Sequence, residues 1–275
     1  MSKKKKIISI TVFIAIVSLL IVGIILTRGS YKETETIQEI MKDAVLHDAE
    51  KVSLFGILYV NPGLISAYTV TAILFIFALI IRIFFIPRFK RIPGKLQLLL
   101  EQAVGMFDNM AKSNSPHRNK FLGAYIFTAG TYICIGTLFE LFGVQAVTPD
   151  GVSVTLPAPL SDINGAIALG CLSYLIILSG GIIGNRLKGV GSTLKDFSLP
   201  ISMSFRLFGA LLSGALVTDL VYYYSLTSYV IPVIVGILFT ILHALIQAYV
   251  LTMLTALFYG EVSESHIKPR KIKSQ

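Results

Sequence analysis

The feature that most constrains this chain is a series of apolar runs, each long enough to cross a lipid bilayer as a helix. A crossing takes about 20 apolar residues, because a helix rises about 1.5 Å per residue through a core of roughly 30 Å. With 54% hydrophobic residues, 14% charged residues and a mean hydropathy of +0.76, the sequence predicts an all-α polytopic membrane protein. Its six hydrophobic segments are residues 7–26, 64–86, 121–142, 163–183, 197–224 and 229–259.

The two ends of this series differ from the middle. The run at 7–26 follows four lysines and precedes no A-x-A-like cleavage site, so we expect an N-terminal anchor rather than a signal peptide. The last two runs exceed the length of an upright crossing, so we expect a long tilted C-terminal helical hairpin. An amphipathic cytoplasmic helix is expected at 96–110. We divide the chain into residues 1–50, the anchor with an outer polar segment, and residues 51–275, one membrane domain.

The basic residues predict how the chain is oriented. With the N-terminus inside and six crossings, 19 of the 24 Lys and Arg residues lie on the cytoplasmic side, and four, all within 28–51, lie outside. The positive-inside rule therefore places both termini in the cytoplasm. Because these residues occupy short connections rather than one aromatic-rich surface, the net charge of +9 does not indicate nucleic-acid binding.

The one remaining basic residue, Arg206, lies inside the apolar run 197–224. An arginine at the bilayer centre costs about 2.5–3.5 kcal/mol on insertion scales, so this position predicts a function. On a helix, Ala210 and Ser213 share its face, and such small residues let another helix approach closely. The alternative is a packing role, with the arginine extending to one interface.

The last apolar run supplies polar side chains that a helix would align. His243 and Gln247 are four residues apart and so share one face. Arg206 and Gln247 each lie about 20 residues from the turn that joins the two final runs. Antiparallel packing of these runs brings both side chains to similar depth, so we expect Arg206 and Gln247 to pair.

The stretches around these residues resemble a known family. "LPISMSFRLFGALLSG" and "HALIQAYVLTMLTALFYGEVSE" resemble the a subunit of the membrane sector of F-type ATP synthases, and "RIPGKLQLLLE", "LFELFG" and "LSDINGAIALG" agree with it in order and spacing. The resemblance covers roughly residues 50–264. It implies a stator that holds two offset half-channels against a ring of c subunits, with a b-subunit peripheral stalk among the partners.

The resemblance also assigns roles to residues. Arg206 matches the family's essential arginine, and Gln247 matches the glutamine that faces it. It implies no cofactor, a translocated ion that is H⁺ or Na⁺, and no catalytic site of its own. ATP is then handled by partner subunits, in agreement with the lack of a Walker-type glycine loop in the sequence. The lysine-rich composition favours a bacterial plasma (inner) membrane.

The sequence departs from the family at two relay positions in the outer half-channel, which are Ala215 and Thr240. Asp219 lies one helical turn beyond Ala215, and His243 lies one turn beyond Thr240. We expect the outer half-channel to be lined by acids and an amide, namely Asp219, Glu140, Asp162 and Asn164. Helix capping by Asp219 and Asp162, and a core role for His243 bonded to a backbone carbonyl, remain the alternatives. Glu261 and Glu264 lie at the expected cytoplasmic exit, either drawing ions or ending a solvated helix.

Three rival functions make different demands on the sequence. A secondary ion or solute transporter with an intramembrane Arg/Asp/His site predicts inverted repeats and matching broken helices, and neither is found. A hydrolase with His243 as base needs an activated nucleophile or a metal motif, and the four histidines are not suitably spaced (47, 117, 243 and 266). A structural scaffold leaves the cost of Arg206 unexplained. Cys134 and Cys171 are expected to be small core residues.

Overall fold

The computed structural model describes residues 11–15, 18, 22, 52–54, 58–117, 119–147, 153–185, 187–223 and 231–264. Most of the predicted anchor at 7–26 and all of the polar segment at 28–51 lie outside these residues. Helices dominate the described part, in agreement with the predicted fold class. They are α3 (Pro62–Ile80), α4 (Lys95–Asn114), α5 (Asn119–Phe139), α6 (Ile163–Asn185), α7 (Leu187–Lys195), α8 (Ser198–Tyr223) and α9 (Ile231–Ser263).

Five of the described helical segments are long and apolar enough to cross a membrane. They coincide with five of the six predicted segments, with ends that differ by a few residues. Asn61 begins the first of them: its side chain accepts a hydrogen bond from the Gly63 N–H at 3.1 Å, and Pro62 occupies the first helical position. This segment continues past α3 through a π turn, η1 (Ile81–Phe85), and a 3-10 turn, η2 (Ile86–Arg88), and ends beside Pro87.

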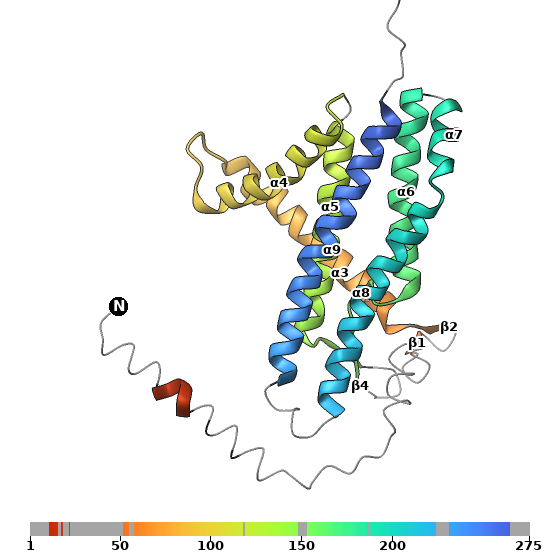
Figure 1. Ribbon diagram of the computed structural model, residues 1–275. Helices are drawn as coiled ribbons and strands as arrows, with labels where there is room; N and C mark the ends of the chain where they lie inside the picture. Colours follow the sequence, from red (N-terminus) through yellow and green to blue (C-terminus); the bar gives the residue numbers. More distant parts are fainter. Residues whose placement is uncertain are drawn as a thin grey trace, which may run out of the picture.

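Both helices of the C-terminal hairpin are unbroken over their described length. α8 has 26 residues and α9 has 33, which makes α9 about 50 Å long at 1.5 Å per residue. That exceeds a hydrocarbon core of about 30 Å, so α9 crosses at a tilt or extends beyond the lipid, and a broken helix is excluded. Figure 1 shows α8 and α9 as long inclined neighbours.

Three features were absent from the sequence prediction. Two short antiparallel hairpins lie near the end of the bundle at which α8 ends and α9 begins (Figure 1): β1 (Val52–Leu54) pairs with β2 (Leu58–Val60), and β3 (Gln145–Val147) pairs with β4 (Ser153–Thr155). The third is α7, a short helix folded back along α6 at the opposite end. The predicted amphipathic helix is α4, which is longer than expected at both ends.

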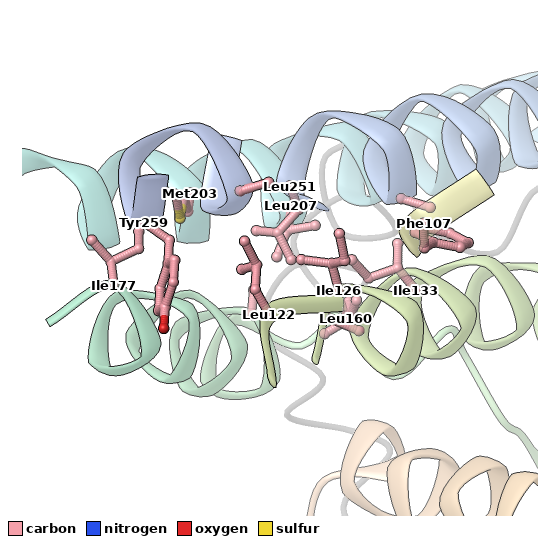
Figure 2. Packing of buried hydrophobic residues seen from close by; sticks show 14 of the residues in the cluster. Phe107, Leu122, Ile126, Ile133, Leu160, Ile177, Met203, Leu207, Leu251 and Tyr259 are labelled. Carbon is pink, nitrogen blue, oxygen red and sulfur yellow. The ribbon is translucent and has the colours of Figure 1, made fainter. Parts of the chain in front are cut away.

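The core lies where α5, α6, α8 and α9 meet, and it positions the inner faces of the last two helices. Figure 2 shows its large apolar side chains interdigitating, with Leu122, Ile126 and Ile133 from α5 facing Leu207 and Leu251. These five residues are at most 3% exposed. Close packing of this kind leaves little freedom for α8 and α9 to rotate, so the residues on their outer faces are held in place as well.

Candidate functional site

Arg206 lies near the middle of a membrane-crossing segment. It is the ninth of 21 residues in the span Ser198–Thr218, about 12 Å along the helix from its start. Its side chain is exposed on the surface of the chain, and it makes no hydrogen bond or ion pair with any other described residue. The structure therefore places a guanidinium at mid-span without a partner in the described part of this chain.

The surface beside Arg206 carries small side chains and is open to a neighbouring helix. Gly209, one turn further along α8, has nothing within 4 Å of the position a Cβ would take. Ser213 is exposed too, but its hydroxyl donates to the Ala210 carbonyl at 2.8 Å, so it presents no free donor. Small, internally satisfied residues let a second helix approach closely, as the sequence predicted for this face.

Gln247 lies near the middle of the membrane-crossing part of α9. It is the fifteenth of 31 residues in the span Val233–Ser263. It is 6% exposed, and its Oε1 is buried without a hydrogen-bond partner among the described residues. No hydrogen bond joins it to Arg206 in this part of the chain, so their pairing stays a prediction. A buried amide oxygen that lacks a donor costs free energy, which makes Gln247 a ready acceptor.

A small cavity brings together the predicted residues Glu140 and His243. It lies between the end of α5, where the 3-10 turn η3 (Glu140–Phe142) begins, and the helices α8 and α9. Its volume is about 10 Å³, close to the smallest space that holds one water molecule. The two relay positions at which the sequence departs from the family, Ala215 and Thr240, line the same cavity. His243 and Glu140 thus supply ionisable groups beside the two positions that lack them.

Hydroxyl groups complete the polar lining of this cavity. Thr137 is 1% exposed, and its Oγ1 has no hydrogen-bond partner among the described residues. Thr218 donates to the Gly214 carbonyl at 2.9 Å, and so retains its lone pairs for another donor. Neither threonine was predicted from the sequence. Thr137 precedes Glu140 by three residues, a spacing that places them on one helical face and would have identified it.

The imidazole of His243 is held by packing. Its Nδ1 lies 3.3 Å from the position a Cβ on Gly214 would take, so α8 and α9 approach closely here because residue 214 is glycine. Phe239 packs edge-on against the ring, with centroids 5.7 Å apart. In the described chain His243 makes no hydrogen bond to a backbone carbonyl, so the alternative of a core histidine satisfied in that way is not what the structure shows.

Asp162 and Asn164 lie at a different place from Glu140 and His243. Both line a larger cavity of about 350 Å³ between α3, α5 and α6. Asp162 caps α6, because its Oδ1 accepts a hydrogen bond from the Asn164 N–H at 3.2 Å, as the capping alternative predicted. The position of Asp219 lies within the described part of α8, and its side chain lies outside the description, so both predictions for this residue stay open.

The end of α9 is tied to the rest of the bundle by polar contacts. Asn185 donates to the carbonyls of Val262 and Glu264, at 3.1 and 2.7 Å, and His117 shares a 2.9 Å hydrogen bond with Ser263. The Glu261 and Glu264 side chains are exposed. The two thiols are free, with Cys134 half-buried and Cys171 exposed, so only the first fits the expected core role.

The sequence profile of the ATP synthase A chain family matches residues 66–260, a range that contains α8, the cavity residues and Gln247. This chain belongs to the ATP synthase A chain family. Among curated relatives, "ATP synthase subunit a" of Cereibacter sphaeroides is 26% identical over 188 residues, covering 64% of this chain and 72% of the relative. The protein of the same name from Histophilus somni is 26% identical over 204 residues, covering 61% and 76%.

Proposed function

We propose that this chain is the stator ion-channel subunit of a rotary F-type ATP synthase. Its two offset half-channels pass H⁺ or Na⁺ to and from carboxylates on a ring of c subunits, which couples ion flux to ATP synthesis. The observation that carries the proposal is the exposed guanidinium of Arg206 at mid-span, without a partner among the described residues. Family membership, which covers this residue, agrees with it.

The charge of Arg206 requires a partner from outside the described chain. Placing an arginine at the bilayer centre costs about 2.5–3.5 kcal/mol or more, and an approaching carboxylate offsets that cost. Guanidinium stays protonated at any accessible pH, so it favours the ionised form of a carboxylate that passes it. A ring site therefore releases its ion at Arg206. The same positive charge repels free cations, which prevents ions from leaking directly between the half-channels.

The outer half-channel passes through the cavity that contains Glu140 and His243. A carboxylate and an imidazole in one cavity can exchange a proton directly or through one water molecule, and the cavity has about the volume of one. Thr137 supplies the unpaired hydroxyl that such a water needs. In this proposal His243 and Glu140 replace the relay groups that Ala215 and Thr240 lack, and Asp219 lies further along α8 towards the outer surface.

The remaining polar residues divide between the two ends of the bundle. Glu261 and Glu264 are exposed at the end of α9, where carboxylates raise the local cation concentration at the inner exit. Gln247 lies between the two ends and keeps an acceptor available near the ring carboxylate. Asp162 and Asn164 line a separate cavity against α3, and we propose that this cavity belongs to the outer half-channel as well.

The arrangement of the helices supports the proposed orientation. The basic connections around α4, α5 and α7 and the end of α9 lie away from the end of α8, the start of α9 and the two hairpins (Figure 1). With the basic ends in the cytoplasm, α9 ends inside. We extend this to both termini and to a bacterial plasma membrane, with the c-subunit ring, the b-subunit peripheral stalk and the lipid bilayer as partners. ATP is made or hydrolysed by other subunits of the complex.

The test is ATP-driven ion pumping by vesicles that contain the whole complex. We expect Arg206→Ala to abolish pumping, because no fixed charge then makes ring carboxylates release their ions. Arg82→Ala is the matched control, since Arg82 is also exposed on a membrane-crossing segment but lies on η1, the continuation of α3. Normal pumping by Arg206→Ala would refute the stator mechanism. In the unmodified complex, collapse of transport by a protonophore identifies H⁺, whereas Na⁺ uptake that persists identifies Na⁺.

A further inference from the structure

The connection between α3 and α4 carries an unusual concentration of exposed charge. Four basic residues lie within eight positions, and all are exposed: Arg88, Lys90, Arg91 and Lys95. None of them forms an ion pair with another described residue. The nearest described acid along the chain, Glu101, already accepts a hydrogen bond from Gln97 at 2.7 Å. This loop, residues 88–95, therefore presents uncompensated positive charge.

The backbone of this loop is held in place by hydrogen bonds to α4. The Gln97 side chain accepts from the Lys90 N–H at 3.1 Å and donates to the Lys90 carbonyl at 3.0 Å, so one amide joins the loop backbone to the first turns of α4 in both directions. Pro87 and Pro93 fix two further backbone angles in the connection. Because the backbone is constrained, the basic side chains are held as a group, and less ordering is needed when they bind an anion.

Apolar side chains emerge beside these charges. Ile92 is 86% exposed at the tip of the loop, and Leu96 and Leu99 are 51% and 65% exposed at the start of α4. The same stripe of α4 continues to Phe107, which is buried against the bundle. In Figure 1 the loop end of α4 projects away from the bundle, so no other helix among the described residues covers its first turns.

The position of the loop indicates what covers it. The span Pro62–Arg88 has 27 residues, and only 6% of its 18-residue apolar window is buried inside the protein. It is about 40 Å of helix, which is more than the hydrocarbon core requires. Its surface therefore faces lipid, and Arg88 at its end lies at the boundary between acyl chains and headgroups. Basic residues at this level bind anionic headgroups, while adjacent apolar residues enter the acyl region.

We propose that residues 88–99 form a binding site for an anionic phospholipid, whose phosphate contacts Arg88, Lys90, Arg91 and Lys95 while Ile92, Leu96 and Leu99 enter the acyl layer. The proposal does not depend on the stator mechanism, because it uses only the membrane location and the described surface. Each basic residue near an anionic membrane surface contributes about a fivefold gain in binding. The cluster therefore distinguishes anionic from zwitterionic lipids more strongly than isolated surface lysines do.

The experiment uses the purified whole complex in nanodiscs with trace photoactivatable phosphatidylglycerol or, separately, phosphatidylcholine. Labelled peptides are identified by mass spectrometry. We expect phosphatidylglycerol to label residues 88–99 at least fivefold more than phosphatidylcholine does, and unlabelled phosphatidylglycerol to compete. The variant Arg88→Gln/Lys90→Gln/Arg91→Gln should lose this preference. The matched control, Lys120→Gln/Lys188→Gln/Lys195→Gln, removes the same charge from exposed positions elsewhere and should keep it.

Four results would overturn the proposal. Equal labelling by the two lipids, or labelling unchanged in the loop variant, would show that the basic residues do not select a headgroup. An absence of lipid labelling at 88–99 combined with a lysine-directed cross-link from Lys90 or Lys95 to another subunit would show that a protein covers this surface. Loss of labelling in both triple variants would assign the effect to total charge rather than to this loop.

Discussion

Replacing Gly170 with alanine is expected to displace α8, the helix that carries Arg206. Gly170 lies on α6 where this helix meets α8. A Cβ at this position would overlap the Ser204 Oγ, and it would lie 3.1 Å from both the Pro200 carbonyl oxygen and the Ser204 backbone nitrogen. The Ser204 hydroxyl is engaged with the Pro200 carbonyl at 2.7 Å, and the backbone atoms cannot rotate away. The two helices must therefore separate.

The expected loss of stability and of pumping can be estimated from these contacts. Overpacking a close-packed interior costs about 1–3 kcal/mol, and alanine returns about 1 kcal/mol through its helix propensity, so the net destabilisation is up to about 2 kcal/mol. The backbone contacts require α8 to move by a few tenths of an ångström. Arg206 is two residues beyond Ser204 and moves with it. Since a displacement of about 1 Å costs on the order of 100-fold in rate, we expect about a tenfold loss of pumping.

The assay compares ATP-driven ion pumping with ATP hydrolysis in vesicles, at equal amounts of assembled complex. Gly105→Ala is the matched control, because a Cβ on Gly105 of α4 meets nothing within 4 Å and the change should be neutral or stabilising. The double variant Gly170→Ala/Ser204→Ala removes the Ser204 hydroxyl and should recover part of the pumping. If Gly170→Ala pumps and denatures like Gly105→Ala, then the α6–α8 contact does not position Arg206, and the reasoning fails.

Three further changes test the cavity and the helix cap. Gly214→Val should reduce pumping at least tenfold by filling the cavity beside His243, whereas Gly191→Val, whose Cβ meets nothing, should pump normally; equal rates would refute this. Thr137→Val should leave the denaturation midpoint of the complex nearly unchanged but slow ion flux, and Thr137→Ser, which keeps the hydroxyl, should restore the flux. Equal ion flux in the two variants would show that the hydroxyl has no role. Asp162→Ala should lower the stability of the complex by about 1 kcal/mol through loss of the cap, and Asp162→Asn, which retains an acceptor, should not; similar melting curves for both would contradict the capping role.

Much of the architecture can be predicted from local sequence. Five crossing segments were located within a few residues, because burial in lipid requires about 20 consecutive apolar residues whatever surrounds them. Arg206 stands out for the same reason, since an ionised residue in such a run is costly in any fold. The short helix α7 was missed because nine residues provide too few turns for a clear pattern. The position of α7 depends on its packing against α6, because Gly181 of α6 and Gly189 of α7 let the two helix backbones come into contact.

Which candidate residues meet was decided by the tertiary structure. Glu140 and His243 are separated by more than 100 residues, and they share a cavity because α5, α8 and α9 pack around one core. Asp162, which the sequence placed with Glu140, lies instead between α3 and α6. Helical periodicity determines which residues share a face of one helix, and the sequence contains that information. The neighbour that each face meets depends on the packing of side chains from distant segments, and only the folded chain specifies it.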